Sequence, residues 1–323
     1  MYRYLVKRLL LVIPTLFGAA ALVFFLMRLI PGDVCLVRLG AGGATVTAQA
    51  LHTCHVKLGL DKPLWLQFVL FIWGLFHFNL GISLWSGYPV SYEIATRFPI
   101  TLEIAIFATV LSIMIAVPAG TISAIKQNSW TDFFVRTFAI SGIAMPSFWL
   151  GIMTLIGVLN LSQYLTGREW MPPISYIPLL QHPLENLSAV FLPAITVGYQ
   201  FSAVVMRMTR SAMLEVLRED YIRTARAKGL IERIIINRHA LKNSMLPVVT
   251  VIGIQFAFLI GGLVVTEQVF NINGLGRLLV EAVQNEDYTL TQGIVLLVVT
   301  VFILTNLIID IVYAWLDPRI RYA

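Results

Sequence analysis

The sequence predicts an all-α membrane protein with six transmembrane helices and with both termini in the cytoplasm. Hydrophobic residues make up 58% of the 323 residues and charged residues only 12%, whereas an ordinary soluble domain carries about 25% charged residues. The mean hydropathy is +0.81. Long uncharged windows recur along the chain, and about 20 apolar residues are enough to cross the hydrocarbon core as a helix. The composition therefore excludes an ordinary soluble domain.

Five windows are long and uncharged enough to cross a bilayer, namely 9–27, 104–125, 188–206, 248–266 and 290–309. A sixth window, 137–160, is weaker because Pro146 and Ser147 interrupt it. Prolines also occur at positions 14, 118 and 193. Neighbouring helices of a membrane bundle can satisfy the carbonyl groups that a proline leaves free. We therefore predict six spans.

Residues 64–81 are apolar and aromatic, and counting them as a seventh span would move every later loop to the other side of the membrane. Six spans with a cytoplasmic N-terminus place 16 of the 23 basic residues inside, nine of them between positions 207 and 242. Cytoplasmic loops carry an excess of Lys and Arg. We therefore expect 64–81 to be an interfacial or re-entrant segment of the outer face, with Trp65, Trp73 and Trp85 at the level of the headgroups.

The chain is expected to form one membrane domain, residues 1–323, with two large loops. The first is an extracytoplasmic loop, 31–98, and the second is a cytoplasmic loop, 207–247. The N-terminus has a basic start, but its apolar run is long and lacks a small-residue cleavage site. We therefore expect this run to be a retained first span and no signal peptide.

The segment MLEVLREDYIRTARAKGL, residues 213–230, is crowded with charge, and a loop of this length needs a purpose. Helical spacing of its apolar residues predicts a stripe formed by Leu214, Leu217, Tyr221 and Ala225. The side chains near the end of this segment are small, and Gly229 can end the helix in a left-handed conformation.

A second helix is predicted through ERIIINRHALKNSM, and Pro247 then stands near the start of the fifth span, where a missing N–H costs little. Two short helices joined by a corner of small residues, just beneath the membrane, predict a protruding element that binds another protein. The alternative is a basic loop that only fixes the topology.

Several motifs accompany this loop in a characteristic order. Besides EDYIRTARAKGL and RHALKNSMLP in the loop itself, they are IPGD at 30–33, LGLDKP at 58–63, MRMTRSAMLEVL at 206–217, VFNINGLGRLL at 269–279 and DPRIRY at 317–322. With these motifs the chain resembles, over nearly its whole length, the membrane permease subunits of ABC importers, in the branch that handles peptides, nickel and related solutes.

The resemblance implies that the cytoplasmic loop is the coupling loop, which inserts into a cleft of an ATP-binding subunit and transmits its closure. The Glu-Ala-Ala core of that loop is replaced here by Arg223, Thr224 and Ala225, which fits the peptide and nickel branch. Contact with the ATPase is expected at Glu219, Asp220, Tyr221, Thr224, Ala225, Ala227, Lys228 and Gly229.

The resemblance also implies the partners. They are a homologous second permease, two ATP-binding cassette subunits and an extracytoplasmic solute-binding protein, acting in the inner membrane by alternating access. The solute is expected to be a peptide, with a nickel chelate or another small solute as alternatives. Nucleic acid is not expected as a binding partner.

Enzyme motifs are missing from the sequence. It contains no G-x-x-x-x-G-K-[ST], no H-E-x-x-H and no G-x-S-x-G. We therefore expect no enzyme activity and no cofactor in this chain itself, with ATP and Mg bound by partner subunits. Ionisable residues fall near the ends of the spans, unlike those of an ion-coupled carrier. A passive channel or a membrane scaffold subunit is the alternative from another class.

Two smaller groups of residues complete the predictions. Cys35 and Cys54 share the outer loop, where an oxidising environment favours a disulfide; free thiols, or a soft-metal site with His52 and His55, are the alternatives, and no metal site is assigned. Polar residues on the spans are candidates for the translocation path or for helix packing, namely Ser147, Gln255, Glu267 and Asn306.

Overall fold

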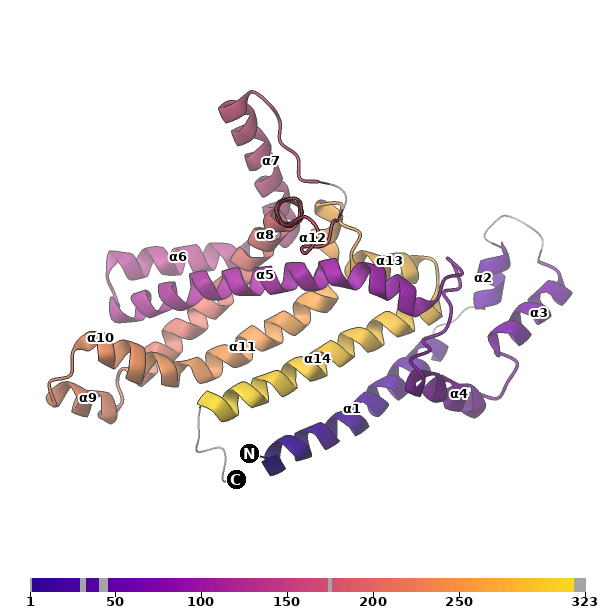
Figure 1. The fold of residues 1–323 in the computed structure, drawn as a ribbon, viewed down its shortest axis with the longest axis horizontal. Helices are drawn as coiled ribbons and strands as arrows, with labels where there is room; N and C mark the ends of the chain where they lie inside the picture. The colour runs from indigo at the N-terminus through magenta and orange to yellow at the C-terminus, as the bar shows by residue number, and fades with distance from the viewer. Residues whose placement is uncertain (1, 30–32, 41–45, 174–175, 317–323) are drawn as a thin grey trace.

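The computed structural model describes residues 2–29, 33–40, 46–173 and 176–316, and these residues form helices joined by loops (Figure 1). Within these ranges the only β-pairing is an isolated bridge between Ile82 and Pro89. The DPRIRY motif and the first three residues of IPGD lie outside the described residues. Six helical segments are long and apolar enough to cross a membrane: Arg8–Leu29, Val90–Ile125, Ser147–Thr166, Pro183–Val216, Glu232–Gly262 and Tyr288–Tyr313. The predicted number of spans is therefore confirmed.

The weak sixth window, 137–160, is divided at its predicted interruption, and the span lies later than predicted, at Ser147–Thr166. Helix α6 (Trp130–Ala144) ends before Pro146, and α7 (Ser147–Thr166) begins after it. A proline lacks the N–H that would continue the ladder and disfavours helical backbone in the residue before it. The carbonyl of Met145, at the break, accepts a hydrogen bond of 3.3 Å from the side chain of Gln200.

Helices α5 (Val90–Ile125) and α8 (Pro183–Val216) form the central pair of the bundle. They have 36 and 34 residues, so both extend beyond the 20 or so residues needed to cross the hydrocarbon core. Two glycines allow their backbones to approach closely. A Cβ on Gly198 would lie 2.9 Å from the carbonyl oxygen of Ala108, and one on Gly120 would lie 2.7 Å from that of Met206. Small residues at such crossings are typical of membrane helix packing.

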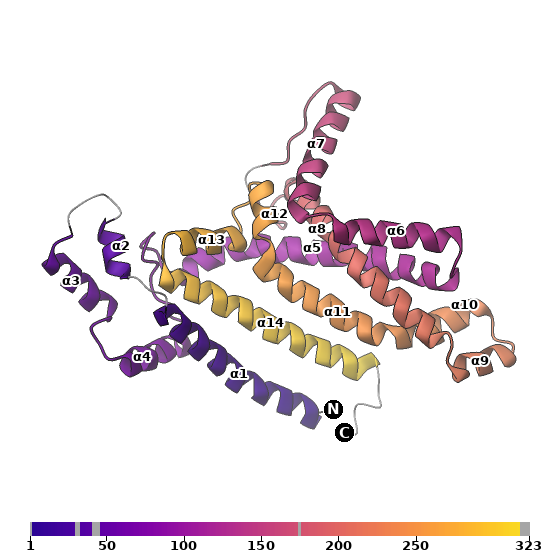
Figure 2. The ribbon, with the colours of Figure 1, turned by 180° about the vertical axis from the view of Figure 1, so that it is seen from behind.

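Three of the remaining spans pack in order on one side of this pair. Helix α11 (Leu241–Gly262) contacts α8 and α5, α14 (Tyr288–Leu316) contacts α11, and α1 (Tyr2–Leu29) contacts α14 (Figures 1 and 2). The fifth span begins earlier than predicted, because α10 (Glu232–Ile234) and the π-helix η1 (Ile235–Ala240) lead directly into α11. Pro247 therefore lies inside a continuous helical run, and its predicted place near the start of the span was wrong.

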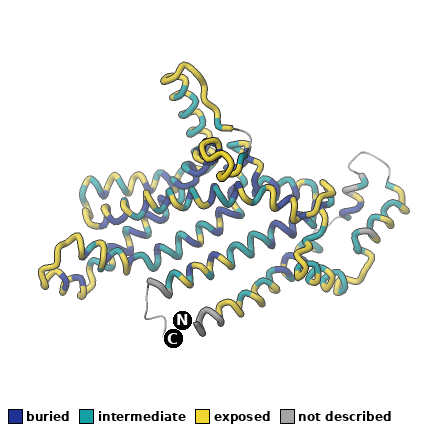
Figure 3. The backbone as a smooth tube through the Cα atoms, in the orientation of Figure 1, coloured by how far each residue is buried: buried dark blue, intermediate teal, exposed yellow. Residues whose placement is uncertain are grey.

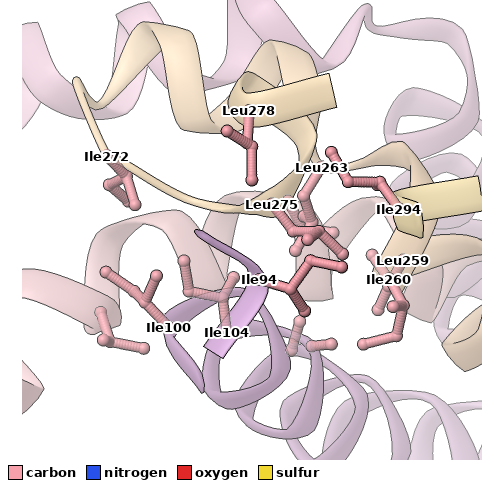
Figure 4. Packing of buried hydrophobic residues seen from close by; sticks show 14 of the residues in the cluster. Ile94, Ile100, Ile104, Leu259, Ile260, Leu263, Ile272, Leu275, Leu278 and Ile294 are labelled. Atoms are coloured by element: carbon pink, nitrogen blue, oxygen red, sulfur yellow. The ribbon is translucent and has the colours of Figure 1, made fainter. Parts of the chain in front are cut away.

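The main hydrophobic core lies near the outer end of the bundle. It joins α5 and α8 to α11, α14 and the short helix α13 (Leu275–Gln284). Figure 4 shows Ile94 and Ile104 of α5 facing Leu263, Leu275 and Ile294. This core fixes the outer ends of these four spans. A smaller apolar cluster, which includes Met213 and Ile222, holds the cytoplasmic end.

Residues 64–81 do not contain a span. Helix α4 (Leu64–Phe76) has 13 residues, which gives a length of about 20 Å, too short for a hydrocarbon core of about 30 Å. Its Phe68 and Phe71 pack against Phe24 of α1, and its Gln67 accepts hydrogen bonds from Arg28. The helix therefore lies against the outer end of the first span.

Exposed segments lie at both ends and at one side of the bundle. The outer end carries α2 (Val34–Gly40), α3 (Ala48–Leu58) and α12 (Val264–Val269) in addition to α4 and α13, and the other end carries α9 (Asp220–Ala227). Helix α7 projects away from the other spans (Figures 1 and 2). Figure 3 shows much of α7 and α9 in the colour of exposed residues.

Candidate functional site

Helix α9 is displayed at the cytoplasmic end of the bundle, beyond the ends of α8 and α11 (Figure 1). It is separated from α8 by a short turn in which the N–H groups of Arg218 and Glu219 donate to the carbonyls of Glu215 and Val216. Glu219 occupies the N-cap position, and the hydroxyl of Thr224 donates to the carbonyl of Asp220. The predicted helix–turn–helix of the loop is thus present, with its first helix starting at Asp220.

One face of α9 is buried in a cluster of apolar side chains. Ile222 and Ala225 pack with Met213 of α8 and with Ile235 and Ala240 of η1. Tyr221, which was predicted on the apolar stripe, is instead 41% exposed, and its hydroxyl accepts a hydrogen bond from Asn243. The predicted stripe was therefore wrong by one residue, because the helix restarts after the turn at 217–219.

This orientation changes the role of Ala225. Its side chain packs in the interior of the loop, and its predicted contact with an ATPase stays a prediction. The other predicted contact positions are all exposed, namely Glu219, Asp220, Tyr221, Thr224, Ala227, Lys228 and Gly229.

Gly229 ends the helix in the left-handed conformation that the sequence predicted, with φ of +77°. Its N–H donates to the carbonyl of Arg226 at 2.9 Å, and the N–H of Leu230 reaches the carbonyl of Ala225 at 3.4 Å. No heavy atom lies within 4 Å of the place where a Cβ would stand. Within this chain the glycine is therefore required by its backbone angle.

Charged side chains surround the exposed face of α9. Arg226 pairs with Glu232 at 2.7 Å and so links α9 to α10, and this hydrogen bond raises the pKa of Arg226. Asp220 pairs loosely with Arg223 at 3.5 Å. A groove of about 540 Å³ adjoins the start of the helix, lined by Arg210, Ser211, Leu214, Glu215, Arg218, Glu219 and Asp220. The surface is polar and exposed.

A buried carboxylate connects this end of the bundle to α6. Asp132 is fully buried, and its two oxygens accept hydrogen bonds of 2.8 and 2.9 Å from Arg210 of α8. Ser123 of α5 and the N–H of Asn128 also donate to it. We name Asp132, Arg210 and Ser123 the cytoplasmic latch, because they join α5, α6 and α8.

The candidate pathway residues lie on different helices. Ser147 is the first residue of α7, Gln255 lies within α11 and Asn306 lies on α14. Ser147 and Gln255 are half-buried, and Asn306 is exposed. The structure records no hydrogen bond among these three side chains in the described ranges. Their contact with a solute stays a prediction.

Glu267 is fully buried at the outer end. Its carboxylate accepts hydrogen bonds from the hydroxyl of Thr101 at 2.7 Å and from the N–H of Arg277 at 2.8 Å, while Thr101 accepts one from the N–H of Leu275. Burial raises the pKa of Glu267, and these hydrogen bonds oppose the rise. Glu267 therefore ties the first turn of α13 to α5 and does not face an open space.

Cys35 and Cys54 are joined by a disulfide, with Cα atoms 5.9 Å apart, which links α2 to α3. Beside it, the Nε2 atom of His55 lies 2.9 Å from both oxygens of Asp33. Burial acts to raise the pKa of Asp33, but the hydrogen bonds from His55 and Cys35 outweigh it, and the net shift is downward. His52 is exposed on the same helix.

Sequence reasoning missed three buried carboxylates, of which Glu93 pairs with Arg97 one turn away on the same helix and the other two bind distant segments. The first of these two is Asp132, and the second is Asp287, which accepts hydrogen bonds from Ser83, from the N–H of Trp85 and from the N–H of Leu290. A local signal existed for Asp132, because it follows the N-cap Ser129 by three residues. The partners themselves are too distant in sequence to be read from a pattern.

Two family models match nearly the whole chain. Residues 116–322 match the family described as "Binding-protein-dependent transport system inner membrane component". Residues 1–105 match the family described as "Binding-prot-dependent transport system membrane comp, N-term".

Two relatives match over their full lengths. The dipeptide transport system permease protein DppB of Escherichia coli (strain K12) is 42% identical over 340 aligned positions, which cover 100% of this chain and 99% of that protein. The glutathione transport system permease protein GsiC of Escherichia coli O6:H1 is 42% identical over 322 positions, which cover 100% of both chains.

The fold also resembles a solved transporter. A chain of the inward-facing MetNI methionine ABC transporter superposes with a TM-score of 0.53 at 16% identity, covering 70% of this chain and 97% of that one. At this identity the likeness concerns the fold alone. The chain belongs to the family of binding-protein-dependent transport system inner membrane components, and it is a multi-pass inner-membrane permease of an ABC importer.

Proposed function

We propose that the chain forms half of the translocation pathway of an ATP-driven peptide importer and that α9 couples it to the ATPases. A homologous permease supplies the other half, two ATP-binding cassette subunits bind ATP and Mg, and an extracytoplasmic binding protein delivers the solute. The chain itself binds no cofactor. Peptides are proposed as the solute because the relatives carry the names dipeptide and glutathione permease.

The observation that carries the coupling role is that α9 is buried on one face and exposed on the other. Its inner face is held by Ile222 and Ala225 in the apolar cluster with α8 and η1, while its outer face is exposed. A force applied to the exposed face is therefore transmitted to the cytoplasmic ends of α8 and α11. Close-packed apolar contacts transmit displacement well because they leave little free volume.

The latch extends this connection to the neighbouring helices. Arg210 lies on α8 just before the loop, and its bidentate pairing with Asp132 makes α6 follow α8. Movement of α9 toward its counterpart in the second permease would then move α5, α6 and α8 together. Alternating access follows when ATP binding draws the two loops together and hydrolysis releases them.

A charge reversal at the exposed surface tests the proposal. Lys228 and Lys126 are both exposed at the cytoplasmic end. In the recorded hydrogen bonds each lysine takes part through its own backbone atoms and not through its side chain. Lys228→Glu should lower peptide uptake and recovery of the ATPase with the purified permease, whereas Lys126→Glu should leave both near wild type. Equal behaviour of the two variants, with both permeases inserted at normal levels, would contradict a docking role for α9.

A further inference from the structure

The outer pair of helices α2 and α3 brings together four side chains that are common metal ligands. Ligand atoms of Asp33, Cys35 and His55 all lie within 4.8 Å of one another, and Cys54 is covalently joined to Cys35. The two helices lie side by side at the outer end of the molecule (Figure 1). The disulfide is thus surrounded by a carboxylate and an imidazole.

The chemistry of this group suits a zinc-like cation. Zn²⁺ prefers four ligands from thiolate, imidazole and carboxylate groups, at about 2.0 to 2.3 Å. Two ligands of one tetrahedral ion therefore lie about 3 to 4 Å apart. The ligand atoms of Asp33, Cys35 and His55 lie within 4.8 Å of one another, so they need to approach by only about 1 Å to bind one ion. The sulfur of Cys54, which is bonded to that of Cys35, has to move away from it after reduction to become the fourth ligand.

We propose that Asp33, Cys35, Cys54 and His55 form a binding site for a Zn²⁺-like divalent cation when the disulfide is reduced. The loop is then closed in either redox state, by the S–S bond when oxidised and by the cation when reduced. Reduction by an external dithiol or phosphine adds two electrons and two protons to the disulfide and yields two thiols. Binding of the cation by both thiolates releases two protons to the solvent.

The surroundings favour this site over a chance pair of thiols. Cys35 is fully buried, which restricts the motion of its sulfur, while the side chains of His55 and Asp33 are 32% and 28% exposed and leave an entry path. Asp33 also accepts the N–H of Cys35 at 2.9 Å. The same carboxylate therefore orients both a sulfur-bearing residue and the imidazole.

The full-length permease in detergent allows a direct test with Co²⁺ as the probe. The chain contains only two cysteines, so a thiolate-to-cobalt charge-transfer band can arise only from Cys35 and Cys54. We expect no band with the oxidised protein and a band that saturates at one Co²⁺ per chain after phosphine reduction. Zn²⁺ should displace the cobalt and protect both thiols from alkylation until EDTA is added.

Two histidine variants provide the matched comparison on one helix. His55→Ala should weaken Co²⁺ binding by about tenfold or more, since even loss of a hydrogen bond to a metal ligand costs about 10- to 100-fold in affinity. His52→Ala should bind like wild type. Size-exclusion profiles before reduction, when the disulfide still holds the loop, establish that each variant is folded. Absence of the band in reduced wild type, or equal binding by the two histidine variants, would overturn the proposed site.

Discussion

At the scale of single residues, buried carboxylates hold helices that are far apart in sequence. Asp132 is bonded to Arg210 and Ser123 at the cytoplasmic end, and Glu267 to Thr101 at the outer end. The hydrogen bonds from Arg210 hold the pKa of Asp132 well below its ordinary range, although burial acts in the opposite direction. A buried charge whose partner is removed is strongly destabilising.

Asp132→Asn is therefore expected to lower the free energy of unfolding by about 3 to 5 kcal/mol at pH 7. The pKa of Asp132 is lowered in the folded state, so its stabilising contribution is full above the unfolded-state pKa of about 3.9. This contribution is lost as the pH falls below that value toward the folded-state pKa. The difference in free energy of unfolding between wild type and variant, measured with denaturant, should therefore shrink from about pH 5 to about pH 3, a range that brackets the unfolded-state pKa.

Asp220→Asn is the control for this measurement. The Asp220 side chain is 94% exposed and its pairing with Arg223 is loose, so its removal should change stability little at either pH. A gap between wild type and Asp132→Asn that stays constant from pH 7 to pH 3 would show that the loss does not come from the ionised carboxylate.

Gly274 gives a second prediction at this scale. A Cβ at this position would overlap the carboxylate of Glu267, which has no room to move because it is fully buried. Gly274→Ala should lower the unfolding midpoint, at a cost of about 1 to 3 kcal/mol. Gly18→Ala in α1 is the control, since nothing lies within 4 Å of its Cβ position. Equal midpoints for the two variants would mean that Glu267 is not held as tightly as its hydrogen bonds indicate.

At the scale of elements, α9 is a short helix whose two faces have different tasks. Eight residues are too few for a stable isolated helix, so its shape depends on the cluster beneath it. Ala225 belongs to that cluster, whereas Ala227 is exposed. The same substitution at these two positions separates the internal packing of the loop from its outer surface.

Ala225→Glu should loosen the packing of α9 on the apolar cluster, because it places an unpaired carboxylate among apolar side chains. In the isolated permease, amide hydrogen exchange of residues 220–228 should become faster. Ala227→Glu should leave the exchange unchanged, and any effect of it should appear only in binding of the ATPase. Equal exchange in both variants would indicate that the inner face of α9 has been assigned to the wrong residues.

At the scale of the whole molecule, the distribution of basic residues agrees with six spans. Helix α9, the start of α1 and the end of α14 lie toward one end of the bundle, and α2, α3, α4 and α13 lie at the other (Figures 1 and 2). Positive loops are retained in the cytoplasm, which places α9 inside. The C-terminal end of α7 is then outside, with Tyr164 87% exposed.

Single cysteines in a Cys35→Ser, Cys54→Ser background test this arrangement. Tyr164→Cys should react with a membrane-impermeant maleimide in intact cells, whereas Lys228→Cys should react only after the cells are opened. Both positions are exposed, so neither result depends on burial. Reaction of Lys228→Cys in intact cells would support a seventh span and would reverse the side of α9.

Hydropathy and charge alone determined the number of spans, the outer position of 64–81 and the cytoplasmic position of the loop. These features depend on whether a segment contacts lipid or water, and the apolar or charged character of its residues indicates which of the two it contacts. The left-handed Gly229 was also predictable, because a helix end is a local property. Pro146 was recognised as an interruption, but its consequence for α6 and α7 was underestimated.

Only the tertiary structure decided which residues meet. Ile222, and not Tyr221, is buried because the turn at 217–219 shifts the helical phase, and Ile222 packs with Ile235 and Ala240 of η1. Asp132 finds Arg210 across 78 positions and Glu267 finds Thr101 across 166. Such partners are chosen by the mutual packing of helices, since a buried charge needs a neighbour in space and not in sequence.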